Sequence, residues 1–236
     1  MKKLHRPIVT SSTSKQDSRI TPELMEKDPQ NRLLARGPRL RVEAEMIRDL
    51  TLSASGLLST KLYGPSVRPP QPGSVTETAY GGMSWKVSEG EDRYRRGLYT
   101  FSKRSAPFAS FLTFDAPTGE ASVARREVSN TPLQSLVLLN DEVFFETAQA
   151  LGKKTAVHPG TPEEKVVYAF QRCLTRPPTP DEVTKLTAFQ AAQLDRIAKG
   201  ELKAAELMPK DATPEETAWM TVARILLYLD ETITKN

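Results

Sequence analysis

The sequence Ser129-Asn130-Thr131-Pro132-Leu133-Gln134-Ser135-Leu136-Val137-Leu138-Leu139-Asn140-Asp141 holds the longest apolar run of the chain and carries helix signals at both ends. Thr131 can cap the first amides of a helix, and Pro132 suits the first turn because its missing N–H would have no partner there. Gln134 can complete a capping box with Thr131. Asn140-Asp141 offers a second cap, after which apolar residues recur at helical spacing as far as Gly152. This stretch therefore predicts a short buried helix followed directly by a second helix.

Helical patterns also lie on both sides of this stretch. From Arg39 to Leu58, apolar residues fall on one face at steps of three and four, with Arg41, Glu45 and Arg48 spaced for pairing on other faces. Glu45 and Arg48 could instead stand over the mouth of a site. Three later segments each predict the start of a helix, because they combine a threonine N-cap, a proline in the first turn and a glutamate three residues after the threonine. They are residues 161–164, 179–182 and 213–216.

Residues 59–119 differ from the rest because prolines and glycines interrupt any regular pattern. Aromatic residues such as Trp85, Tyr94 and Phe108 would be costly to expose, so we expect a packed, irregular excursion rather than a disordered loop. Gly97–Phe101 is its best strand candidate. Residues 1–20 lack a clear period and should pack poorly, and residues 233–236 should form a frayed end.

These patterns predict a mainly α fold, an irregular helical domain with a long Pro/Gly-rich excursion and at most a small β element. We expect an N-terminal helical region over 1–152, containing the excursion 59–119, and a C-terminal helical subdomain over 153–236 packed on it. The two could also form one domain, and the chain could be a fragment of a larger protein.

Composition limits the possible chemistry. The longest apolar run is far below the roughly 20 residues that a membrane-spanning helix needs, so no membrane span is expected. One cysteine and two histidines exclude an internal disulfide and Cys-x-x-Cys-His haem attachment, and they are a poor ligand set for zinc. We therefore expect no metal and no cofactor in this chain. Cys173 lies at helical spacing from Val166 and Phe170, which favours a small buried side chain.

Charge is distributed unevenly along the chain. Residues 1–48 contain 11 Lys/Arg and 6 Asp/Glu, whereas residues 141–236 contain 12 and 15. Basic and acidic residues alternate instead of forming a basic stripe with interleaved aromatics, so no nucleic-acid partner is expected. The common nucleotide-binding, serine-hydrolase and zinc-protease motifs do not occur, and the catalytic residues, if any, are unknown from sequence.

Arginine pairs near aromatic residues are the best candidates for ligand binding. Guanidinium groups bind carboxylate, phosphate or sulfate groups and stack on aromatic rings. The simpler interpretation is that they anchor the excursion by binding backbone carbonyls and nearby carboxylates such as Asp92, Asp115 and Glu127. The candidate ligand-binding residues are Trp85, Tyr94, Arg95, Arg96, Asp115, Arg125 and Arg126.

Seven segments in order, and the chain's closing segment, resemble one family, the planctomycete domain of unknown function 1553. The matching segments are Leu4–Ser12, Pro22–Leu24, Asn31–Arg39, Ala44–Asp49, Tyr94–Phe101, Phe114–Pro117, Asn130–Gln134 and the closing 223–231. The resemblance covers nearly the whole chain, but only the C-terminal part of the family domain. Pro7 and Ser14 depart from it, standing where an apolar and an aromatic residue are expected.

The resemblance implies a context for the chain but no catalytic residue. Family members are usually exported multidomain proteins in which this domain follows a cytochrome-c-like haem domain and a second domain of unknown function. It therefore implies an extracytoplasmic location, periplasmic or at the cell surface, and neighbouring domains of the same full-length protein as partners, a haem domain among them.

Two functions remain open from sequence. The first is a noncatalytic structural or docking module of such a larger protein. The second is a polysaccharide-directed hydrolase or carbohydrate-binding module, in which arginines grip anionic substituents and two of Asp115, Glu120 and Glu127 act on the glycosidic bond. Two carboxylates converging in a cleft beside the arginines would favour the second function.

Overall fold

The structure is a computed structural model that describes residues 2–73, 85–174 and 176–235. Contacts divide the chain into two units, Met1–Val42 with Ile233–Asn236, and Glu43–Thr232. The boundary predicted between residues 152 and 153 stays a prediction.

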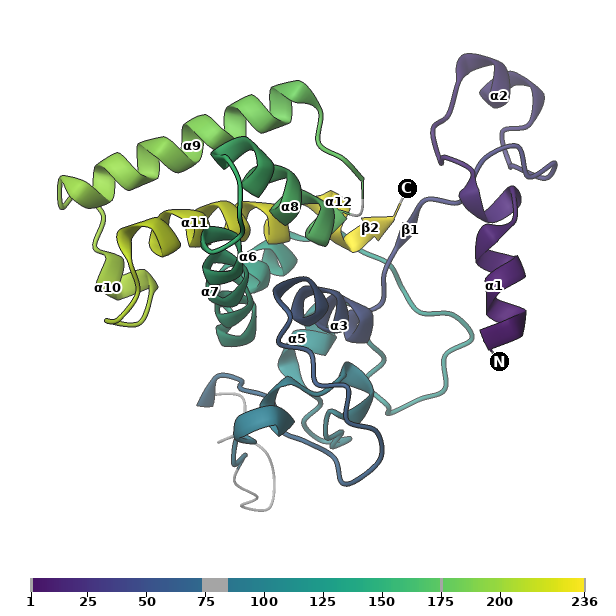
Figure 1. Cartoon of the computed structure of the whole chain (residues 1–236). Helices are drawn as coiled ribbons and strands as arrows, with labels where there is room; N and C mark the ends of the chain where they lie inside the picture. The colour runs from purple at the N-terminus through teal and green to yellow at the C-terminus, as the bar shows by residue number, and fades with distance from the viewer. Residues whose placement is uncertain (1, 74–84, 175, 236) are drawn as a thin grey trace. The chain divides into compact units, whose positions relative to one another are not determined.

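The first unit consists of short elements (Figure 1). They are α1 (Lys2–Thr10), the 3-10 helix η1 (Thr13–Lys15), α2 (Pro22–Lys27), and the strands β1 (Leu40–Arg41) and β2 (Thr234–Lys235). β1 and β2 pair antiparallel, with Leu40 opposite Lys235. The C-terminal residues 234–235 are therefore in a strand, and the predicted frayed end is wrong there.

The second unit is mainly helical, and the predicted mainly α fold with a small β element is confirmed. Among its described residues, the α-helices are α3 (Ala44–Ser55), α5 (Ala109–Thr113), α6 (Pro132–Asn140), α7 (Glu142–Ala156), α8 (Pro162–Leu174), α9 (Pro180–Ala198), α10 (Ala204–Leu207), α11 (Pro214–Tyr228) and all but the last residue of α12 (Asp230–Ile233). Its 3-10 helices are η2 (Gly90–Tyr94) and η3 (Gly97–Tyr99).

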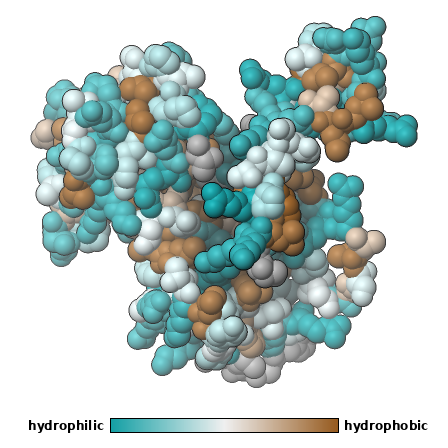
Figure 2. Space-filling model, turned by 45° about the vertical axis from the view of Figure 1, so that its right-hand side comes forward, coloured by the Kyte–Doolittle hydropathy of each residue, from teal (hydrophilic) through white to brown (hydrophobic). Residues whose placement is uncertain are grey.

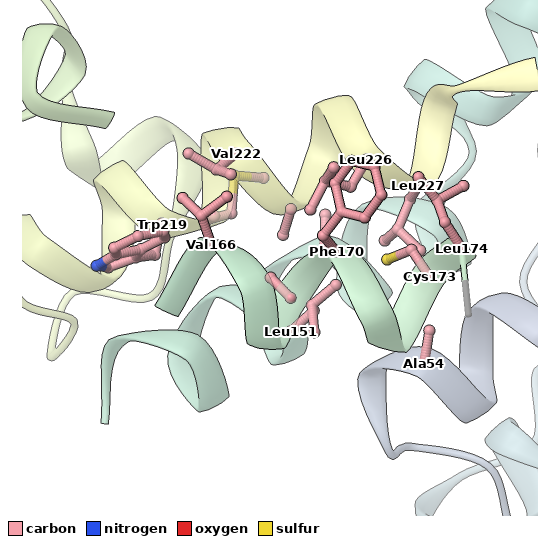
Figure 3. Close-up of a cluster of buried hydrophobic side chains, with 14 of the residues drawn as sticks. Ala54, Leu151, Val166, Phe170, Cys173, Leu174, Trp219, Val222, Leu226 and Leu227 are labelled. Atoms are coloured by element: carbon pink, nitrogen blue, oxygen red, sulfur yellow. The ribbon is translucent and has the colours of Figure 1, made fainter. Parts of the chain in front are cut away.

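The core forms where α11 packs on α7, α8 and α9. Val166 and Phe170 of α8 point toward Val222 and Leu226 of α11 (Figure 3). Cys173 is buried in the same cluster, as predicted. Trp219 is 1% exposed and closes the cluster at one end.

Gly152 does not end α7, because its missing side chain allows a close helix–helix contact instead. A Cβ atom at this position would lie 2.5 Å from the backbone nitrogen and Cα of Met220 in α11. The predicted end of the helix at Gly152 is therefore wrong, and α7 continues to Ala156.

The threonine–proline openings form caps as predicted. The hydroxyl oxygens of Thr179 and Thr213 accept N3 amides, and Glu182 and Glu216 complete the capping boxes at α9 and α11. Thr161 and Glu164 exchange the same pair of bonds at α8. A cap of this kind contributes about 1 kcal/mol to helix stability.

The helix predicted over 39–58 is shorter than expected. α3 begins at Ala44 because Leu40 and Arg41 belong to β1, and it ends where Gly56 takes a left-handed backbone with φ 77°. Glu45 and Arg48 do not pair with each other, since their partners lie elsewhere in the chain.

The excursion 59–119 is irregular in its described part, and residues 74–84 lie outside the described residues. The strand predicted at Gly97–Phe101 is wrong. Gly97–Tyr99 is a 3-10 helix, and the amides of Val67 and Phe101 form only an isolated bridge, with bonds to Tyr99 O (2.8 Å) and Val67 O (2.7 Å). A Cβ at Gly97 would lie 2.9 Å from backbone atoms of Glu45, so η3 sits directly against α3.

Candidate functional site

Arg95, a predicted ligand-binding residue, is 1% exposed and acts inside the excursion. Its guanidinium donates hydrogen bonds to the carbonyl oxygens of Pro65 (3.1 Å), Lys61 (3.3 Å) and Tyr63. It also lies 3.6 Å from the centroid of the Tyr99 ring. Because the side chain is buried and both terminal nitrogens bind carbonyl oxygens, Arg95 fixes the turn at residues 61–65 and is not presented to a ligand.

Tyr94 and Trp85 are likewise half-buried parts of the scaffold. Burial raises the pKa of the Tyr94 hydroxyl, and the nearby Glu146 carboxylate adds to this shift. The Trp85 indole N–H donates to Pro69 O (2.7 Å), and its ring stacks on Phe108 at an interplanar angle of 12°. An indole packed in this way supports the excursion from inside.

Arg48 joins the excursion to α3. It is 4% exposed and donates to the carbonyl oxygens of Arg93 (2.7 Å) and Arg95 (3.3 Å). Burial lowers the pKa of Arg48 to about 10, which leaves it charged at neutral pH. Arg93 in turn binds Glu142 and Glu146 on α7.

A cleft of about 540 Å³ opens between α3, η3 and α5 and is the candidate site. Much of its lining is apolar, and exposed hydrophobic side chains also appear among hydrophilic ones on the face in Figure 2. The apolar side chains of the cleft are Met46, Leu98, Phe101, Pro107, Phe108, Phe111, Leu112, Ala116 and Pro117. Among them, Leu98 is 75% exposed and Met46 is 49% exposed.

Ion pairs form the polar wall of this cleft. Arg126 binds Glu45 with both terminal nitrogens (2.7 and 3.1 Å), and one of these lies 3.4 Å from Glu43. Arg96 binds Asp49 (2.9 Å), whose other oxygen accepts the Gly97 amide (2.6 Å). The structure thus brings the predicted Arg96 and Arg126 together in one cleft.

The ion pair with Arg126 determines the protonation of Glu45. Burial raises the pKa of the Glu45 carboxyl, but the hydrogen bonds and positive charge of Arg126, with a backbone hydrogen bond, outweigh burial. The pKa of Glu45 therefore lies below its ordinary value, and the pKa of Arg126 is raised mainly by the same hydrogen bonds. Both groups are charged at neutral pH.

Asp115 lies in a cluster beside the cleft and not on its wall. Its carboxylate accepts bonds from the Ser129 amide (2.8 Å), the Ser129 hydroxyl (2.8 Å) and the Gln134 side-chain nitrogen (3.3 Å). The predicted capping box at Thr131 is wrong in its second half, because Gln134 is used in this cluster. Asp115 has a left-handed backbone, φ 62°, which the cluster holds in place.

The remaining predicted residues are not brought into the cleft. Arg125, Glu120 and Glu127 are exposed. Of the carboxylates on the cleft wall, sequence reasoning placed Glu45 near a possible site but missed Glu43 and Asp49. The spacing of Glu45 and Asp49, four residues apart on one helix face, was the available signal.

The described residues contain neither a group of side chains suited to a metal ion nor a helix suited to a membrane. In residues 2–73, 85–174 and 176–235, no three His, Cys, Asp or Glu side chains are grouped to hold a metal ion. In the same part of the chain, no helix has the length and apolar character needed to cross a membrane.

The fold and cleft define a mainly helical protein whose aromatic cleft is walled by ion pairs. A family model described as "Protein of unknown function (DUF1553)" matches residues 1–190, and the chain belongs to this family. No curated protein and no solved structure matched the chain.

Proposed function

We propose that the chain is a noncatalytic docking module that binds a neighbouring domain of a larger exported protein through the cleft between α3, η3 and α5. The observation that carries this proposal is the pairing of the cleft's charged groups. Arg96 is bound to Asp49 and Arg126 to Glu45, so the cleft offers a partner chiefly its apolar surface.

The protonation state of Glu45 argues against acid–base catalysis at this site. A glycoside hydrolase needs a carboxylic acid whose raised pKa keeps it protonated near neutral pH. The pKa of Glu45 is lowered, and Asp49 is bound by Arg96 and by the Gly97 amide. Neither carboxylate is placed to deliver a proton.

The apolar residues at the cleft suit a protein partner. Methionine adapts its shape to different partners, and an exposed apolar patch on a soluble protein is typical of an interaction site. A second hollow of about 480 Å³ shares Met46, Asp49 and Arg96 with the cleft, and continues along Leu58 and Leu62. The two hollows together give a partner a continuous surface beside α3.

Family resemblance supplies the identity of the proposed partner. We propose that it is a neighbouring domain of the same full-length protein, with a cytochrome-c-like haem domain as first choice, and that both lie outside the cytoplasm. The chain itself would contribute no cofactor. Cell fractionation of the native host with an antibody to this chain tests the location, and recovery only in the cytoplasmic fraction would contradict it.

Photocrosslinking in the native host tests docking. Benzoylphenylalanine at position 98 should crosslink to a neighbouring domain of the full-length protein, as identified by mass spectrometry. The same probe at position 133 is the control, because Leu133 is also exposed (57%) but lies on α6 outside the cleft. Crosslinks no stronger at position 98 than at position 133 would refute docking through the cleft.

A polysaccharide-directed hydrolase or carbohydrate-binding module is the second candidate. It is favoured by one observation, the presence of Glu43, Glu45 and Asp49 in one cleft beside Arg96 and Arg126. Incubation with neutral and sulfated polysaccharides, followed by an assay for new reducing ends and by affinity electrophoresis, separates the candidates. Reducing ends released by the wild type but not by Glu45→Gln would establish the hydrolase.

A further inference from the structure

The first unit exposes apolar side chains without burying a core of its own. Of the Leu, Ile, Val and Met residues between positions 2 and 42, only Leu24 and Val42 are half-buried, and none is fully buried. The exposed ones are Leu4, Ile8, Val9, Ile20, Met25, Leu33, Leu34 and Leu40. Scattered exposed apolar residues are normal, but this segment exposes nearly all of its own.

Polar groups, not a core, fix the loop that presents Leu33 and Leu34. The carboxylate of Asp28, 6% exposed, accepts the amides of Arg32 (2.8 Å) and Leu33 (2.7 Å). The guanidinium of Arg36, 9% exposed, donates to the carbonyl oxygens of Asp28 (3.0 Å) and Pro29 (2.7 Å).

The Asn31 side chain closes this loop. It donates to Arg36 O (2.7 Å) and accepts the Arg36 amide (3.2 Å). The loop is therefore held at both ends by buried or half-buried polar groups, and its conformation is set before any partner binds.

The loop holds Leu34 in a backbone conformation that leucine rarely adopts. Its φ is 54°, and that of Asn31 is 52°. Left-handed backbone costs an L-residue about 1 kcal/mol or more, and asparagine tolerates it better than leucine. Leu33 is 79% exposed and Leu34 59%, so this cost is not offset by burial within the unit. Strain held by a rigid surrounding is a sign of a functional contact.

The charge of this segment indicates the chemistry of its partner. Residues 1–42 contain 10 Lys/Arg and 4 Asp/Glu, whereas residues 43–232 contain 22 and 25. Two of the four acidic groups, Asp17 and Glu23, are paired with Arg19 and Lys27. The segment thus has a positive excess next to its exposed apolar residues.

A protein surface fits these features better than a lipid surface. Membrane-surface helices present one long apolar face, but here the apolar residues are spread over α1, α2, the Leu33–Leu34 loop and β1. α1 has only nine residues and contains Pro7.

We propose that residues 2–42 are a docking element for an acidic protein surface with an apolar patch, and that Leu33 and Leu34 are its anchor. The buried Asp28 and Arg36 hold the anchor in its bound conformation, and the basic residues around it select an acidic partner. The residues of this surface belong to the first unit and those of the cleft to the second, and the two tests use different probes, so either proposal can fail without the other.

The test uses the full chain and the double variant Leu33→Ser/Leu34→Asn. Asparagine accepts the left-handed φ, so the variant should unfold at the same or a higher urea concentration than the wild type. The control is Leu133→Ser, which removes from α6 a leucine whose exposure (57%) is close to that of Leu34 (59%). The probe is a fluorescein-labelled amphipathic peptide of leucine and glutamate, and binding is measured by fluorescence anisotropy.

We expect the leucine–glutamate peptide to bind the wild type and Leu133→Ser equally, and the double variant at least about tenfold more weakly, because two buried leucine contacts are lost. Added salt should weaken binding to the wild type. Hydrogen exchange should show protection of residues 31–36 on binding. A matching leucine–lysine peptide should bind poorly.

Four results would overturn the proposal. They are equal binding by the double variant, equal or tighter binding of the leucine–lysine peptide, no binding of either peptide, and binding only to phosphatidylglycerol vesicles. The last result would assign the surface to a membrane instead of a protein.

Discussion

Replacing Arg95 with methionine should destabilise the excursion far more than replacing its neighbour Arg96. Arg95 is 1% exposed and donates hydrogen bonds to the carbonyl oxygens of Lys61, Tyr63 and Pro65. Its guanidinium also stacks on the ring of Tyr99. The Arg96 side chain is 51% exposed and makes one ion pair with Asp49. Two adjacent arginines therefore provide a matched comparison.

The expected cost of Arg95→Met follows from its contacts. Three partly buried carbonyl oxygens that lose a charged donor cost about 1 kcal/mol each, since water can reach some of them. The lost cation–π contact adds about 0.5–1 kcal/mol. The free energy of unfolding should fall by about 3–4 kcal/mol, whereas Arg96→Met should cost no more than about 1 kcal/mol, the usual limit for an exposed ion pair.

Urea unfolding followed by circular dichroism measures both variants. Hydrogen exchange adds a local check, because the Tyr63 amide is bonded to the Tyr99 hydroxyl (2.8 Å) and should exchange faster once Arg95 is gone. A loss below about 1 kcal/mol in Arg95→Met, or equal losses in the two variants, would refute the structural role of Arg95.

Three other changes test the packing and the ion pairs. Asp115→Ala should cost about 2–3 kcal/mol in urea unfolding and speed hydrogen exchange at Ser129, because three donors lose their acceptor; unchanged exchange there would contradict this. Gly152→Val should lower the unfolding free energy by at least about 2 kcal/mol, since its Cβ would meet the Met220 backbone at 2.5 Å; a stable variant would show that α7 and α11 can separate freely. The hydrogen bonds from Arg176 lower the pKa of Glu182 to about 2, so this pair stabilises the fold above pH 4.5 and the effect is lost as pH falls toward 2. The melting temperature of the wild type minus that of Glu182→Gln should therefore decrease as the pH falls from 4.5 toward 2. A difference that stays constant over this range would exclude a stabilising effect of the pair.

Local signals in the sequence predicted where several helices begin, but the prediction that α6 is a buried helix is wrong in part, because Leu133 (57%) and Leu136 (55%) are exposed and only Gln134 and Leu138 are buried. Thr179-Pro180 and Thr213-Pro214 contain the whole cap within four residues, so the cap forms whatever the rest of the chain does. Cys173 was placed correctly because its helical spacing from Phe170 follows from the same local geometry.

Distant partners explain the errors. Gly97–Phe101 has strand-forming residues, but Gly97 must approach Glu45 on α3 and the backbone turns into a 3-10 helix. Gln134 was expected to complete a cap and instead binds Asp115, 19 residues away. Such pairings are decided by tertiary contacts that propensity does not contain.

The candidate site was predicted by residue type but not by role. Arg95 and Arg96 are the same residue in neighbouring positions, yet one is buried against carbonyl oxygens and the other stands on the cleft wall. Glu45 was linked to Arg41 and Arg48 by helical spacing, but it pairs with Arg126, 81 residues away. Side-chain spacing within one helix does not indicate a partner from a loop.

Turnover by the cleft is the most direct test of the noncatalytic docking function. Wild type, Glu45→Gln and Asp49→Asn should be incubated with the same neutral and sulfated polysaccharides, and new reducing ends measured against a buffer blank. Because Glu45 and Asp49 are held as paired carboxylates, all three proteins should release no more reducing ends than the blank. Release by the wild type that either substitution abolishes would contradict a docking module and make the cleft an active site.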